Sequence, residues 1–361
     1  MTLTSRPGIL DVAPYVGGEA EAAGFAEPIR LASNENPLGA SPRAQEAYGA
    51  LSADLHRYPD GGAQALRRAI AARHGLDPAR IVCGNGSGEL ISLLIRAYAG
   101  PGDEVLYSAH GFLLYAIDAK TAGATPVAVP ERDLTADLEG LIERAGPRTR
   151  VVCLANPNNP TGSCLSGSQL ERLVEGLPDH VLLLLDAAYA EYVMRNDYED
   201  GAKLVEANER VVMTRTFSKI HGLAGLRLGW AYAPAEVVDV LNRMRGPFNV
   251  TAPALAAGLA AIEDRDYAAR SRGHNAQWLE WFRQETAALG LDPRPSAGNF
   301  VLLRFPGENG HDAVTALGWL KERGILVRGM AAYGLPDCLR VTIGTEAETR
   351  AVVAALAEFV A

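Results

Sequence analysis

The stretch Val211-Val212-Met213-Thr214-Arg215-Thr216-Phe217-Ser218-Lys219 decides the fold, because an apolar run passes directly into a polar turn that ends in a lysine. The apolar run predicts a buried strand, and ligands of open parallel sheets bind at the C-terminal ends of such strands. A lysine held at that edge can be deprotonated and can attack an aldehyde. The stretch therefore predicts a ligand site, although a surface lysine on an ordinary turn explains the same residues.

Three residues near Lys219 add groups that suit a phosphate. Thr216 and Ser218 supply hydroxyls, and Arg227 supplies a cation, a set that can hold a dianion. An amine nucleophile beside a phosphate clamp indicates one cofactor above others, pyridoxal 5′-phosphate (PLP), whose aldehyde the lysine would bind.

Length and composition limit the class of protein. The chain has 361 residues, enough for two domains or one large one, and its 48% hydrophobic and 21% charged residues are ordinary values for a soluble globular protein. The formal net charge of −9 argues against nucleic acid as a partner. The four cysteines and seven histidines show no metal-ligand spacing, so we expect reduced thiols and no metal. No signal pattern or membrane-length apolar run is found, which favours the cytoplasm and no membrane partner.

Apolar runs alternate with helix-length segments up to about residue 255. Strands are expected at residues 81–83, 104–107, 126–129, 151–154, 181–185, 211–213 and 226–231. Continuous apolar strands separated by helices predict an α/β protein with a mostly parallel sheet covered on both faces. The later pattern fits a smaller α+β domain. We expect a large domain over residues 36–254 and a small domain from residues 1–35, which include an N-terminal arm, and 255–361.

Polar turns follow several of these strands. The turn Gly84-Asn85-Gly86-Ser87-Gly88-Glu89 precedes an apolar helix, whose free backbone N–H groups can bind an anion. Asp186 follows five apolar residues, where a carboxylate needs a partner such as a protonated pyridine nitrogen, and Tyr189 could bond the ring hydroxyl. A helix-capping role for Asp186 remains an alternative. Asn159 lies in a turn rich in Asn, Pro and Gly, which has a purely structural interpretation too.

Other candidates line the expected ligand site from further along the chain. Phe112 could stack on a planar cofactor or belong to the core. Arg328 and Arg340 lie in or beside apolar strands, where a guanidinium needs an anion, either from a substrate or from a structural ion pair. His110 is interpreted as a bystander and His221 as a neighbour of Lys219 without a catalytic part.

Taken together, these motifs resemble the fold-type I PLP-dependent aminotransferases, and within them the histidinol-phosphate aminotransferase family. Their order and spacing match over nearly the whole chain. The resemblance rests on Asn34-Glu35-Asn36-Pro37, Arg57-Tyr58-Pro59-Asp60, residues 84–89, residues 158–162, Asp186 with Tyr189, residues 215–229 and Leu339-Arg340-Val341.

The resemblance implies a role for each site residue. It makes Lys219 the lysine that bonds to PLP and later moves the Cα proton, with Asp186 on the pyridine nitrogen and Asn159 and Tyr189 on the ring oxygen. Phe112 takes the stacking position. The cofactor phosphate is implied to lie among Ser87, Gly88, Thr216, Ser218, Arg227 and, from the other subunit of a homodimer, Tyr58. The substrate is implied to lie among Tyr15, Asn36, Arg328 and Arg340.

The implied reaction converts histidinol phosphate and 2-oxoglutarate to imidazole acetol phosphate and glutamate, in histidine biosynthesis. An aromatic amino acid aminotransferase acting on Phe or Tyr is one alternative, and a PLP-dependent amino-acid-phosphate decarboxylase is another. A PLP-sensing transcription regulator is disfavoured by the acidic charge. The chain departs from the family pattern at Ala187 and in Ser108-Ala109-His110-Gly111, where proline is usual, and at Phe112, where tyrosine is frequent. The loop change bears on substrate specificity.

Overall fold

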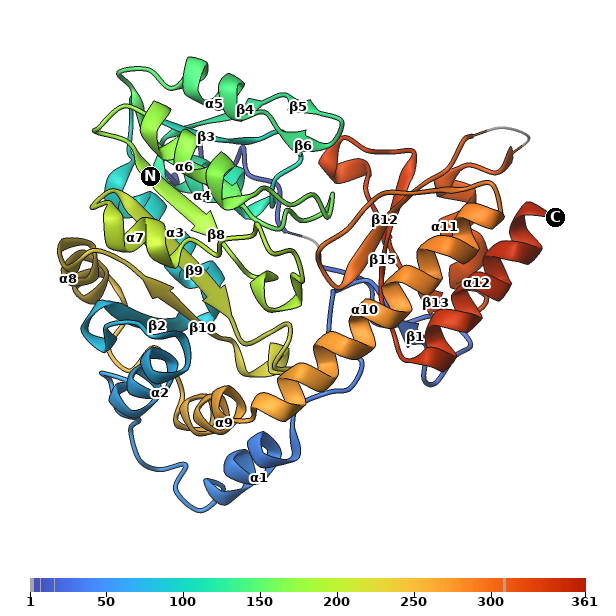
Figure 1. Ribbon diagram of the computed structural model, residues 1–361, viewed down its shortest axis with the longest axis horizontal. Helices are drawn as coiled ribbons and strands as arrows, with labels where there is room; N and C mark the ends of the chain where they lie inside the picture. Colours follow the sequence, from blue (N-terminus) through green and yellow to red (C-terminus); the bar gives the residue numbers. More distant parts are fainter. Residues whose placement is uncertain (1–2, 7, 16, 308–309) are drawn as a thin grey trace.

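Two β-sheets organise the chain in the computed structural model, which describes residues 3–6, 8–15, 17–307 and 310–361. The larger sheet has seven strands in the order β2-β10-β9-β8-β7-β3-β4 (Figure 1). Its strands are β2 (Ile81–Asn85), β3 (Glu104–Ser108), β4 (Thr125–Val129), β7 (Thr149–Ala155), β8 (Leu182–Asp186), β9 (Val211–Thr216) and β10 (Leu228–Tyr232). All neighbours are parallel except β10, which is antiparallel to β2 and β9. The predicted mostly parallel sheet is therefore confirmed.

Helices cover both faces of this sheet, as the continuous apolar strands require. Alternate residues of β8 face opposite sides: Leu183 and Leu185 join one buried cluster, and Leu182 and Leu184 join another. The first cluster includes helices α2 (Gln64–His74), α5 (Leu138–Arg144), α6 (Gly167–Gly176), α7 (Ala202–Ala207) and α9 (Ala252–Glu263). The second includes α3 (Gly86–Tyr98), α4 (Leu114–Ala122) and α8 (Ala235–Met244).

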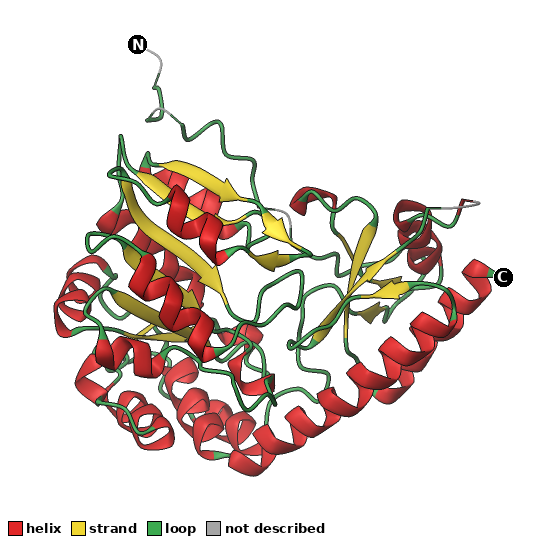
Figure 2. Cartoon of the chain, turned by 45° about the horizontal axis from the view of Figure 1, so that its top comes forward, coloured by secondary structure: helices red, strands yellow, loops and turns green. Residues whose placement is uncertain are grey.

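The smaller sheet lies on the other side of the molecule (Figures 1 and 2). Its order is β11-β12-β15-β14, with β11 (Asp292–Pro293), β12 (Phe300–Arg304), β14 (Arg328–Gly329) and β15 (Cys338–Thr342). Helices α10 (Arg265–Ala288), α11 (Ala313–Glu322) and α12 (Glu346–Val360) pack on it in a separate core. The N-terminal strand β1 (Ile29–Arg30) pairs with β13 (Ile325–Leu326) in this part. The domain boundaries at 35/36 and 254/255 stay predictions.

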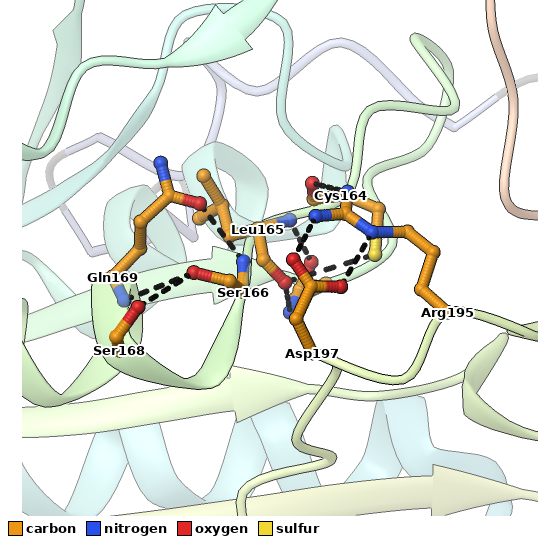
Figure 3. A network of polar contacts seen from close by, with 8 residues as sticks. Cys164, Leu165, Ser166, Ser168, Gln169, Arg195 and Asp197 are labelled. Carbon is orange, nitrogen blue, oxygen red and sulfur yellow. Dashed lines mark hydrogen bonds and ion pairs between the residues drawn. The ribbon is translucent and has the colours of Figure 1, made fainter.

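Local sequence signals explain where several helices begin. Helix α1 (Pro42–Ala50) has Ser41 as its N-cap, with Oγ accepting from the backbone N of Ala44 at 3.2 Å, and Pro42 in its first turn. Helix α6 begins with a capping box in which Ser166 and Gln169 bond each other's backbone N–H (Figure 3).

A polar network fixes the loop between β7 and α6, in which Asn159 lies. Arg195 donates to the carbonyl of Cys164 at 2.7 Å and pairs with Asp197 at 2.6 Å (Figure 3). Asn156 bonds both backbone groups of Leu165. These contacts hold both ends of the loop, so the segment that carries Asn159 is anchored to the large sheet.

Candidate active site

A cavity of about 390 Å³ lies where the C-terminal ends of the large-sheet strands face the small sheet. Most predicted site residues line it, and they come from both parts of the chain. They are Tyr15, Ser87, Gly88, Phe112, Asn159, Asp186, Tyr189, Thr216, Ser218, Lys219, Arg227, Arg328 and Arg340. Tyr58 and Asn36 do not line it.

Lys219 follows strand β9 and points its amine into this cavity. Nζ donates to the carbonyl of Ser33 at 3.0 Å and lies 5.8 Å from the centre of the Tyr189 ring. Burial and the nearby Arg340 cation lower the pKa of Lys219 to about 7. A substantial fraction of this amine is therefore neutral near pH 7, the form that attacks an aldehyde and accepts a proton.

Asp186 ends strand β8 as a buried carboxylate with one acceptor unused. Oδ2 accepts from the Tyr115 hydroxyl at 3.0 Å, whereas Oδ1 is buried without a hydrogen-bond partner. Burial raises the pKa of Asp186 to about 6. An orphaned buried carboxylate oxygen needs a donor, and a protonated pyridine nitrogen supplies one. The capping alternative for Asp186 does not account for this orphaned oxygen.

Tyr189 and Asn159 stand on the cavity wall with their own supports. The Tyr189 hydroxyl accepts from Asn34 Nδ2 at 2.8 Å, and burial raises its pKa to about 12, so it keeps its proton as a donor. Asn34 is itself bonded to Thr342 of strand β15. Asn159 Oδ1 accepts from Arg340 at 2.5 Å, which leaves the amide nitrogen of Asn159 as its donor.

A cradle for a dianion forms where helix α3 begins. Its first turn carries Ser87 and Gly88, whose backbone N–H groups have no intrahelical acceptor. Arg227 Nη1 bonds Ser218 Oγ at 3.2 Å, and its Nη2 lies so near Gly86 that a Cβ there would sit 2.5 Å away. Glycine at position 86, with φ of +79°, therefore lets the guanidinium approach the helix terminus.

Arg328 and Arg340 lie side by side on neighbouring strands of the small sheet. They are direct partners in the antiparallel pairing of β14 and β15. Arg340 is buried, and it donates to Asn159 and to the carbonyl of Ala32, while its Nε has no partner. The hydrogen bonds of Arg340 to described residues involve no carboxylate, which argues against a structural ion pair for this residue. Both side chains line the cavity, and two guanidinium groups there suit an anionic ligand.

The structure departs from the sequence predictions at one position, Asn36. Asn36 was predicted to contact substrate, but it is buried outside the cavity, where its amide donates to Ile220 O at 2.8 Å and to Ser271 Oγ at 3.0 Å. Its amide thus fastens the loop before α1, and we assign it no ligand. Tyr58, which was predicted to reach the cavity of another subunit, is 84% exposed and stacks on Phe248, and its role stays a prediction.

The sequence alone assigned no role to two residues that support the site. Tyr115 and Asn34 supply the donors for Asp186 and Tyr189, yet neither residue type stands out in its segment. His110 pairs with Glu131, and His221 stacks on Phe217, as neighbours outside the cavity lining. Across the described residues, no group of three or more His, Cys, Asp or Glu could hold a metal, and no helix could cross a membrane.

The neutral lysine, the orphaned carboxylate and the cationic cradle together fit PLP, so fold and site define a fold-type I PLP-dependent transferase. The family model of class I and II aminotransferases matches residues 26–356, and the chain belongs to that family. It is 58% identical to the histidinol-phosphate aminotransferase of Paramagnetospirillum magneticum, with 98% of each chain covered. The same identity and coverage hold for the histidinol-phosphate aminotransferase of Rhodospirillum centenum.

A solved structure of the same kind has a similar fold. The histidinol-phosphate aminotransferase from Sinorhizobium meliloti, in complex with pyridoxal-5′-phosphate, superposes with a TM-score of 0.90. It is 30% identical to this chain, and 99% of this chain and 98% of that one are covered.

Proposed function

We propose that this chain is a PLP-dependent aminotransferase that converts histidinol phosphate and 2-oxoglutarate to imidazole acetol phosphate and glutamate in histidine biosynthesis. One observation carries the proposal: Arg328 and Arg340 form a directly paired cationic wall of the same cavity that holds Lys219. Such a wall suits the phosphate of an amino substrate and the carboxylates of a 2-oxo acid. The names of the full-length relatives support the same substrate.

The cofactor would be held at both of its ends. Its phosphate would lie in the cradle of Ser87, Gly88, Thr216, Ser218 and Arg227, and its ring between Phe112 and the polar groups of Asp186, Asn159 and Tyr189. When bound, PLP supplies a conjugated ring that draws electrons from the substrate Cα.

The chain's own groups would then move and hold protons. Lys219 Nζ, a substantial fraction of which is neutral near pH 7, would accept the Cα proton and return it to the cofactor carbon that carries the aldehyde. A positioned base of this kind contributes roughly 10²–10⁴-fold to the rate. Asp186 would keep a proton on the pyridine nitrogen, because its unpartnered Oδ1 is an acceptor in a buried site. Tyr189 would donate to the ring oxygen.

We propose further that two subunits complete each site. Tyr58 is exposed outside its own cavity, and Leu55 in the same loop is 72% exposed, which suits a loop that reaches a second copy. A homodimer with shared sites, a cytoplasmic location and the division into domains at 36–254 and the remainder belong to this proposal.

The test is a half-reaction on purified, PLP-loaded protein. Histidinol phosphate, phenylalanine and tyrosine are added separately, and conversion of the cofactor from its aldehyde to its amine form is followed by absorbance. A strong preference for histidinol phosphate is expected. Comparable rates with phenylalanine or tyrosine would indicate the aromatic aminotransferase instead, and release of carbon dioxide would indicate the decarboxylase.

A further inference from the structure

One buried carboxylate holds the loop that leads to Phe112. Glu131 lies in the hairpin of β5 (Glu131–Arg132) and β6 (Thr135–Ala136). Its Oε1 accepts from Ser108 Oγ at 2.5 Å and from the backbone N of His110 at 3.2 Å, and its Oε2 lies 2.8 Å from His110 Nδ1. Only 2% of the Glu131 side chain is exposed, so these contacts replace its hydration. The reaction proposed above uses none of them.

The loop held by Glu131 delivers Phe112 to the cavity. The backbone N of Gly111 bonds the carbonyl of Ser108 at 2.7 Å, and a Cβ at Gly111 would lie 2.9 Å from that oxygen. The Phe112 ring then meets the Tyr115 ring edge-on at 6.0 Å. Tyr115 also donates to Asp186. The loop therefore bears on two groups of the cavity, Phe112 directly and Asp186 through Tyr115.

The other end of the hairpin reaches the small sheet. Asp133 and Leu134 at its tip have φ values of +46° and +59°, a conformation that side chains rarely adopt without support. Asp133 forms an ion pair with Arg294. Leu134 packs, together with Leu113, against the buried cluster of Leu302, Met330, Tyr333, Leu335 and Cys338. Figure 1 draws β5 and β6 on the side of the large sheet that faces β12 and β15.

We propose that Glu131 is a positioning residue: through Ser108 and His110 it fixes the turn that places Phe112 against the PLP ring. The contacts of Asp133 and Leu134 at the hairpin tip keep the Phe112 side of the cavity aligned with the sheet that carries Arg328 and Arg340. The inference rests on the proposed function for the identity of the ligand. Glu131 itself lies outside the cavity lining.

The first experiment compares Glu131→Ala and Glu131→Gln with the wild-type chain. PLP is titrated into each apoprotein, and the dissociation constant and the visible circular dichroism of the bound cofactor are measured. Glu131→Ala should weaken PLP binding about tenfold and reduce the dichroism, because a buried acceptor with three contacts is lost. Glu131→Gln keeps an acceptor oxygen and should recover part of both. Glu139→Gln, which removes an ion-paired carboxylate on the next helix, should change neither.

The second experiment asks whether Glu131 acts through Phe112. If it does, Glu131→Ala combined with Phe112→Leu should bind PLP no more weakly than Phe112→Leu alone. Should Glu131→Ala not fold, Glu131→Gln takes its place in both experiments. Additive losses, or a lower melting temperature with unchanged PLP affinity and dichroism, would overturn the inference and leave the proposed function standing. A wild-type chain that binds no PLP would overturn both.

Discussion

At the scale of single residues, Lys219 combines reactivity with a cost in stability. Its pKa of about 7 lies below the usual 10.5, mainly through burial, so the unfolded chain binds more protons between those pH values. Lys219 therefore lowers the stability of the apoprotein most at and below pH 7, and this cost fades as pH rises toward 10.5. We expect Lys219→Met to abolish turnover and to raise the apoprotein melting temperature at pH 7, with the gain shrinking at pH 10. Lys203→Met, at an exposed position, is the control.

Asp118 is a second buried titratable residue, but it lies away from the cavity. It accepts from Ser92 Oγ at 2.6 Å between helices α4 and α3, and burial raises its pKa from 3.8 to about 6. A raised folded-state pKa gives stability that is present below pH 3.8 and is lost as pH rises through 6. Asp118→Asn should therefore stabilise the protein at pH 7.5, by at most about 3 kcal/mol, and should remove most of the decline in stability between pH 3.8 and pH 6.

Denaturant unfolding from about pH 4 to pH 8 measures this effect, because the range covers both pKa values of Asp118. Asp239→Asn, on the exposed face of α8, provides the matched control, since its carboxylate is 61% exposed. A loss of stability in Asp118→Asn at pH 7.5 would contradict the prediction, because it would mean that the ionised carboxylate stabilises the folded protein.

At the scale of elements, the contact of strand β10 with helix α3 shapes the phosphate cradle. A Cβ at Gly229 would lie 2.2 Å from the backbone N of Ser87, so alanine would push the strand and the helix terminus apart. We expect Gly229→Ala to cost about 1–3 kcal/mol of stability and to weaken PLP binding tenfold or more. Gly225→Ala, nearby with open space around its Cβ, should change neither. If Gly229→Ala and Gly225→Ala bound PLP equally well, the contact between β10 and α3 would have no part in phosphate binding.

The elements also show what sequence patterns can and cannot predict. The strand ends of the large sheet were predictable, because five apolar residues before Asp186 favour a buried strand followed by a polar edge. Polar residues that directly follow these apolar runs could therefore be predicted to line the cavity. Contacts that depend on tertiary packing did not: Asn36 and Asn34 share one motif, yet only Asn34 reaches Tyr189. Glu131 begins a two-residue strand with no periodicity, so its hold on the Phe112 loop was invisible.

At the scale of the whole molecule, the exposed Tyr58 can be used to test whether each cavity is completed by a partner subunit or by its own chain. If each cavity needs Tyr58 from a partner, Tyr58→Ala and Lys219→Ala homodimers should both be inactive or nearly so, for different reasons. A hybrid dimer of the two would contain one cavity with an intact lysine and an intact tyrosine. Random pairing in an equimolar mixture makes half of the dimers hybrids, so about a quarter of the wild-type activity should return.

Subunit exchange is checked by tagging one variant and purifying the mixed dimers before the assay. Phe248→Ala serves as a further probe, because the Phe248 ring stacks on Tyr58 at 4.7 Å within the same chain and would help to aim it. That variant should lower PLP affinity less than Tyr58→Ala does, since the tyrosine hydroxyl is still present. If purified hybrids regain no activity, Tyr58 belongs to no neighbouring cavity. The exposed loop around it would then need another explanation, and each cavity would be completed by its own chain.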